Sequence, residues 1–142
     1  MKNILKLTFL FSVLIVNTAI ADPVAVIVNS ANTQELSQSD VKNIYTDKTI
    51  VWKNGNNIAV YNVPPEEGAT ETFAQKVLGM SARNAASEEA NRVITNTSRN
   101  TQLSKRDALV SSIVAKTPNA IGYIPKDLAD GKPGIRVLFT LQ

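Results

Sequence analysis

A continuous β-branched run near the start of the chain restricts the fold more than any other feature. Residues 23–28 read PVAVIV and contain no polar side chain. A run of this length, rich in Val and Ile, is typical of a strand that is buried on both faces, as in a parallel sheet covered by helices. The sequence therefore predicts a sheet with helices packed on both sides.

Helical patterns and short strands alternate along the rest of the chain. Ser37 and Asp40 have the spacing of a capping box, and the helix that they begin is expected to end near Asp47. Asn54-Gly55 is a strong turn signal. The patterns predict strands over 58–63, 120–124 and 135–140 and a loop over 95–102. They predict helices over 69–78 and 82–94, the second capped by Ser81. A last helix is expected to begin at a Ser104/Asp107 capping box and to end at Lys116.

Apolar residues on two of these helices are expected to face the core. Val93 and Ile94 continue a stripe that begins at Ala82 and Ala86, and Leu109 joins Val110, Ile113 and Val114 on the last long helix. Gly122, inside the strand over 120–124, indicates a bulge or a close approach of another backbone. The four aromatic residues Trp52, Tyr45, Tyr61 and Tyr123 are separated in sequence and are expected to be core or half-buried residues.

This alternation predicts a three-layer α/β or α+β domain. We find no repeat, low-complexity stretch or linker after residue 21, so residues 22–142 are expected to form one domain.

The first 21 residues have the pattern of a cleaved signal peptide. Lys2 and Lys6 precede an apolar stretch over 7–16, and Ala19 and Ala21 fit the A-x-A pattern that a signal peptidase accepts. The stretch is shorter than the roughly 20 apolar residues that span a bilayer. We therefore expect cleavage before Asp22 and a periplasmic or secreted protein.

Composition excludes several classes of function. The chain has no Cys and no His, which argues against zinc and copper sites and excludes Ser-His-Asp and Cys-His nucleophiles. The formal charge of +3 includes two lysines of the first 21 residues, so the remainder carries +1. Its basic residues are scattered, which argues against a nucleic-acid partner. We expect no cofactor and no enzymatic activity.

One segment combines several features of an anion site. In YNVPPEEGATETF, residues 61–73, a strand ends, Gly68 follows and a helix begins near Ala69. Backbone N–H groups at this helix start, with the Thr70 hydroxyl, can hold an anion. The alternative is that Glu66 and Glu67 stabilise the helix dipole themselves and repel an anion.

The loop over 29–33, NSANT, also follows a strand and carries small polar groups, of which Asn29 and Ser30 are candidates to flank a ligand. The alternative is a turn that leads into the next helix.

Three segments together resemble one family. VIVNSANTQELSQSDVKNIYTDKTIVWKNGNNIAVYNV looks like its "strand, V-N, loop, helix, W, G, strand" stretch, and AKTPNAIGYIP looks like its "P-g-A-I-G-Y-v" element. Between them, EEGATETFAQKVLG stands where the family has an S-G-T phosphate loop and a helix. The similarity covers residues 24–139. The family is that of periplasmic phosphate-binding-like proteins, the substrate-binding components of phosphate ABC transporters.

The resemblance implies an α/β fold of the periplasmic-binding-protein type, a single lobe with a mixed sheet flanked by helices. It implies phosphate or another oxyanion as ligand, held near Gly68, Ala69 and Thr70 with Asn29 and Ser30 flanking. The family's S-G-T corresponds to Glu67-Gly68-Ala69, in which the Ser is lost, or with a one-residue slip to Gly68-Ala69-Thr70. The family's upstream Arg has no counterpart over 61–65. A second hypothesis is an accessory module without a ligand, whose partner is another envelope protein or a second copy of the chain.

Overall fold

A mixed five-stranded sheet, in the order β3-β2-β4-β1-β5, forms the centre of the protein. The computed structural model describes residues 13–16 and 21–142. Most of the expected signal peptide lies outside the described residues. No helix in the described part of the chain is long and apolar enough to cross a membrane.

The β-branched run is β1 (Val24–Asn29), and all six of its residues are buried. β1 lies between β4 (Ala120–Pro125) and β5 (Ile135–Leu141) and runs antiparallel to both. The predicted burial is confirmed, but the expectation of a parallel neighbourhood is wrong. An apolar run indicates that both faces of a strand are buried, but it does not indicate the direction of the neighbouring strands.

Three strands run parallel and end at the same edge of the sheet. They are β3 (Gln102–Ser104), β2 (Ala59–Asn62) and β4, and each leads into a helix. These helices are α4 (Asp107–Lys116), α2 (Gly68–Phe73) and α5 (Lys126–Ala129). The helix starts therefore gather at the carboxyl edge of the parallel strands.

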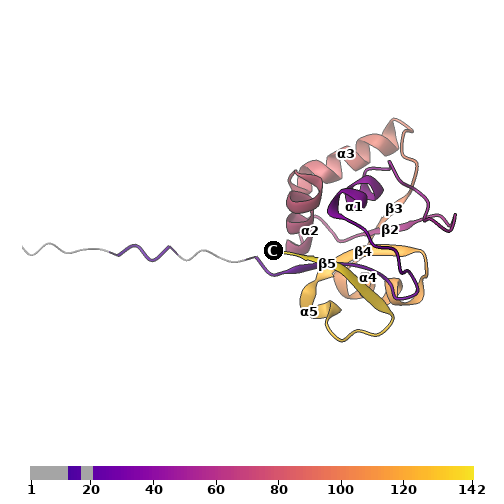
Figure 1. Cartoon of the computed structure of the whole chain (residues 1–142). Helices are drawn as coiled ribbons and strands as arrows, with labels where there is room; N and C mark the ends of the chain where they lie inside the picture. The colour runs from indigo at the N-terminus through magenta and orange to yellow at the C-terminus, as the bar shows by residue number, and fades with distance from the viewer. Residues whose placement is uncertain (1–12, 17–20) are drawn as a thin grey trace, which may run out of the picture.

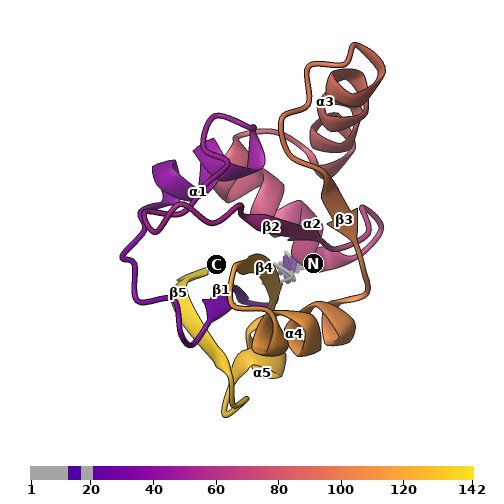
Figure 2. The same ribbon diagram turned by 90° about the vertical axis from the view of Figure 1, so that its right-hand side faces the viewer.

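Helices lie on both faces of the sheet, as Figures 1 and 2 show. α4 and α5 pack on one face, and α1 (Gln38–Tyr45) and α2 pack on the other. The expected capping box of α1 is confirmed, because the Ser37 hydroxyl accepts from the Asp40 N–H and the Asp40 carboxylate accepts from the Ser37 N–H. The expectation of a mixed sheet flanked by helices is confirmed.

The helix expected over 69–78 changes its winding halfway. α2 continues as a π-helical segment, η1 (Ala74–Leu78), which ends at Gly79 with a φ of 75°. α3 (Ala82–Ile94) then begins at the predicted cap, where the Ser81 hydroxyl accepts from the Asn84 N–H. In Figure 2 the far end of α3 projects away from the sheet.

The apolar faces predicted for α3 and α4 are partly wrong. Val93 and Ile94 are exposed because they lie at the projecting end of α3, and Leu109 is exposed on α4. Val110 and Val114 are fully buried against the sheet, as expected.

The segment after α3 was expected to be a loop but contains part of the edge strand β3. Ser104 is the last residue of β3 and does not cap the next helix, which begins one residue after Arg106 without a side-chain cap. The short helix α5 was not predicted. Three residues give too short a pattern to identify an edge strand that pairs on one side only.

Three aromatic rings pack together in the core beside α2. The Phe73 and Tyr123 rings stack with their centroids 4.0 Å apart, and the Tyr45 ring lies 4.7 Å from Phe73. Trp52 is also buried and donates its indole N–H to the Asn119 carbonyl at 2.9 Å. The expected core role of these aromatic residues is confirmed, and Tyr61 is half-buried.

Candidate functional site

The structure places the two predicted site segments at opposite ends of the sheet. Gly68 and Thr70 follow β2 at the carboxyl edge, close to Val24 at the start of β1. Asn29 is the last residue of β1 and Ser30 follows it, and β1 runs in the opposite direction to β4. Five steps of about 3.3 Å put roughly 16 Å between the two ends of β1. The two segments therefore do not converge on one ligand.

The Asn29 side chain is used inside the protein. Its amide group donates to the carbonyl oxygens of Val114 at 2.8 Å and Ala115 at 3.2 Å, and its oxygen accepts from the Ala31 N–H. Asn29 is buried and joins the end of β1 to the end of α4. Ser30 is exposed, and its N–H donates to the Gly134 carbonyl. The geometry is that of a turn, the alternative considered for this loop.

The Thr70 hydroxyl is also committed to the backbone. It lies 2.7 Å from the Pro64 carbonyl oxygen and 3.0 Å from that of Val63, and the residue is 8% exposed. Thr70 thereby ties the start of α2 to the end of the strand that precedes it. By contrast, the N–H groups of Gly68 and Ala69 have no acceptor within the part of the chain that the structure describes.

The Arg106 guanidinium and these N–H groups line the same surface hollow at the carboxyl edge. Arg106, in the turn between β3 and α4, lines the hollow together with Gly68 and Ala69. Arg106 is exposed, and its guanidinium makes no ion pair within residues 21–142. Sequence reasoning missed Arg106, because its proximity to α2 depends on β3 pairing with β2.

Carboxylates dominate the rest of the hollow. The lining also includes Asp22, Glu66, Glu67 and Asp107. Burial raises the pKa of Glu67, the Asp107 and Glu66 charges act in the same direction, and the Asp107 N–H and the Arg106 charge oppose them. The hollow can thus hold an anion on two N–H groups and one guanidinium, but its acids compete with that anion.

The protein has three layers, a mixed sheet with helices on both faces, and a polar hollow lies where the parallel strands end. These two features are typical of α/β folds that bind ligands. The family model of the PBP superfamily domain matches residues 17–132. The chain therefore belongs to the PBP superfamily. A comparison with curated protein sequences found no match.

Solved structures with a similar fold are assigned as phosphate-binding proteins. One is a phosphate ABC transporter substrate-binding protein from Clostridium perfringens with bound phosphate, 26% identical, with a TM-score of 0.58 over 82% of this chain and 44% of that one. An ABC-type phosphate transport receptor from Vibrio cholerae is 17% identical, with a TM-score of 0.55 over 82% of this chain and 45% of that one.

A third, assigned as a phosphate binding protein from Planctomyces limnophilus, is 17% identical, with a TM-score of 0.58 over 82% of this chain and 40% of that one. At 17% identity, the Vibrio cholerae and Planctomyces limnophilus structures show a similar fold and nothing further. The chain spans less than half the length of each of these solved relatives.

Proposed function

We propose that the protein is an exported solute-binding-type protein that binds phosphate or another oxyanion at the carboxyl-edge hollow. In this proposal the anion accepts hydrogen bonds from the Gly68 and Ala69 N–H groups and pairs with the Arg106 guanidinium. Thr70 holds the start of α2 in place, and Asn29 and Ser30 contribute nothing to the contact. The role is binding and not catalysis, in keeping with a relative assigned as a substrate-binding protein.

One hollow brings together two N–H groups and a guanidinium that have no partner among the described residues, and this observation carries the proposal. Arg is well suited to oxyanions because its planar group donates two parallel hydrogen bonds. Free N–H groups at a helix start attract negative charge. Support also comes from the relative that was solved with bound phosphate.

Thermal unfolding with phosphate, sulfate or chloride tests this site. A ligand at about 100 times its dissociation constant stabilises by about 2.7 kcal/mol, which for a domain of this size raises Tm on the order of 10 °C. We expect a shift with phosphate that Arg106→Gln removes. Arg83→Gln, at an exposed position on α3, is the matched control and keeps the shift. A shift that survives Arg106→Gln, or none with any oxyanion, contradicts the proposal.

Export is a separate part of the proposal and has its own test. Ala19 and Ala21 predict that the protein isolated from the cell envelope begins at Asp22. Intact-mass measurement of that fraction distinguishes this start from Met1. A full-length mass in the cytoplasmic fraction contradicts export and leaves the anion test untouched.

The second candidate function is an accessory module that binds another envelope protein or a second copy of the chain. One observation favours it: four carboxylates line the hollow and compete with an anion. If no oxyanion raises Tm, sedimentation of the purified protein and co-purification from the envelope become the measurements that decide it. A monomer without a partner contradicts this alternative.

A further inference from the structure

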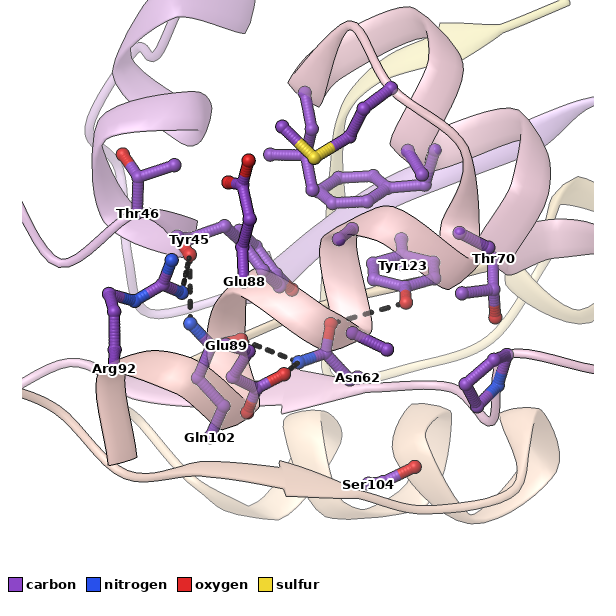
Figure 3. A pocket seen from close by; sticks show the side chains of 18 residues that line it. Tyr45, Thr46, Asn62, Thr70, Glu88, Glu89, Arg92, Gln102, Ser104 and Tyr123 are labelled. Carbon is purple, nitrogen blue, oxygen red and sulfur yellow. Dashed lines mark hydrogen bonds between the residues drawn. The ribbon is translucent and has the colours of Figure 1, made fainter. Parts of the chain in front are cut away.

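A second cavity lies within the fold, between α3, η1 and the sheet, and Figure 3 shows its lining. Its volume is about 240 Å³. Apolar cavities of about 150 Å³ already hold a benzene-sized molecule, so this space suits a small organic ligand. Small apolar side chains, Ala82, Ala85 and Ala86, form the wall on α3.

The wall opposite α3 is aromatic. The rings of Tyr45, Phe73 and Tyr123 all belong to residues that line the cavity, and they form the cluster described above. The Phe73 and Tyr123 rings stack on one another, and the three residues are only 1–3% exposed, so they present little ring face to the cavity. The wall therefore supplies an apolar surface for the alkyl part of a ligand.

The floor of the cavity holds a carboxylate without a cationic partner. Glu89 accepts one hydrogen bond, from the Asn62 side chain at 3.4 Å, and forms no ion pair within the described residues. Figure 3 shows the two side chains pointing toward one another from α3 and β2. Burial raises the pKa of Glu89, the Arg92 charge opposes this, and the Asp47 charge adds to it. A bound cation offsets the cost of this partly buried charge.

The single arginine among the lining residues is already engaged. The Arg92 Nε lies 3.3 Å from the Asp47 carboxylate, and its Nη2 donates to the Tyr45 carbonyl. Glu88 is exposed and also lines the cavity, so the space opens to solvent beside a second carboxylate. The lining thus carries two carboxylates against one arginine that is already paired, and this balance of charge favours a cation over an anion.

We propose that this cavity binds a small organic ammonium ion, with its positive group at Glu89 and its alkyl groups between the aromatic wall and the alanine wall of α3. The inference is independent of the oxyanion site, since Glu89 and the rings take no part in the carboxyl-edge hollow. It adds a second ligand of opposite charge to the proposed function.

Titration with matched probes tests the charge of the ligand. Tetramethylammonium and n-butylammonium are added to the isotope-labelled protein, and the amide resonances of Ala85 and Ala86 are followed by NMR. We expect saturable shifts at millimolar concentrations, and at least about tenfold weaker binding of neutral 1-butanol. Equal binding of butylammonium and butanol, or no saturable shift at tens of millimolar, overturns the proposal.

Three variants locate the ligand. Glu89→Gln keeps the shape and hydrogen bonding of the side chain and should weaken ammonium binding about tenfold or more. Ala86→Leu fills the cavity on a helix that tolerates Leu and should abolish binding of both probes. Arg106→Gln, at the other hollow, should leave ammonium binding unchanged even where it removes the oxyanion response. Ammonium binding at full strength in both Glu89→Gln and Ala86→Leu contradicts the assignment.

Discussion

Gly122 in β4 lies directly against Val110 of α4, where a Cβ atom on Gly122 would stand 2.6 Å from Val110 Cγ1. Val110 is fully buried, so it has little room to move away. We expected a bulge or a close approach of another backbone at this glycine, but the close neighbour is the Val110 side chain, and the pairing of β1 with β4 is regular at Gly122. The contact lets α4 pack tightly on the sheet and so places the turn that carries Arg106.

Replacing this glycine should destabilise the fold through overpacking. We expect Gly122→Ala to lower the free energy of unfolding by about 1–3 kcal/mol, measured by urea denaturation. Gly68→Ala is the control, because nothing lies within 4 Å of its added Cβ, and should change stability by less than about 0.5 kcal/mol. Additive costs for Gly122→Ala and Val110→Ala in the double variant would contradict a steric cause.

The ion pair between Arg92 and Asp47 should be costly to break from one side. The Asp47 side chain is 4% exposed, and its Oδ1 has no partner in the part of the chain that the structure describes. Removing one partner of a buried pair leaves an uncompensated charge, so Arg92→Ala should cost about 3 kcal/mol in urea denaturation. Arg92→Ala with Asp47→Asn should be more stable than Arg92→Ala alone, whereas a less stable double variant would show that the charge of Asp47 is not the cause.

Anion binding at the carboxyl edge should strengthen as the pH falls. The pKa of Glu67 is raised from its usual 4.5, first by burial and then by the Asp107 charge. Glu67 therefore takes up its proton at a pH above 4.5. As the pH falls through the pKa of Glu67, its carboxylate loses its charge and repels a bound anion less. Calorimetry with sulfate, whose charge is constant there, should show tighter binding at lower pH.

The matched variants separate Glu67 from other acids. Glu67→Gln should bind sulfate more tightly at pH 7 and show a flatter pH dependence, and Glu88→Gln should behave like the unmodified protein. An unchanged pH dependence in Glu67→Gln would assign the effect to another group.

Alkaline pH should destabilise the protein through its buried tyrosines. Burial, the largest cause, raises the pKa of Tyr123 to about 12, and it raises the pKa of Tyr45 well above 10. A tyrosine whose pKa is higher in the folded state stabilises fully below pH 10, and this contribution is lost as the pH rises toward 12. The free energy of unfolding should therefore fall over this range.

Tyr123→Phe should make that alkaline decline shallower. At neutral pH it should cost about 1–2 kcal/mol, because the Tyr123 hydroxyl accepts from the Val63 N–H and donates to Asn62, each at 3.2 Å. An equally steep decline in Tyr123→Phe, measured by urea denaturation at several pH values, would assign the loss to other groups.

Local signals in the sequence predicted the elements of this fold well. The Ser37 and Ser81 caps, the turn at Asn54-Gly55 and the burial of β1 all depend on neighbouring residues, which a single sequence displays directly. Strand direction and the edge strand β3 depend on partners far along the chain. The predicted strand direction was therefore wrong, and β3 was not predicted.

The candidate site shows the same division. The position of Gly68 and Ala69 at a helix start follows from the local pattern, and it was predicted. The separation of Asn29 from that helix follows from the antiparallel pairing of β1, and the arrival of Arg106 follows from the pairing of β3 with β2. Neither is a local property.

The position of β1 has a consequence for the order in which the protein assembles. The first strand of the described sheet pairs with β4 and β5, which follow the other strands of that sheet along the chain. Until β5 is available, β1 has no complete place in the sheet. A sheet whose first strand pairs with two strands about a hundred residues away depends on contacts distant in the sequence, and such sheets fold slowly.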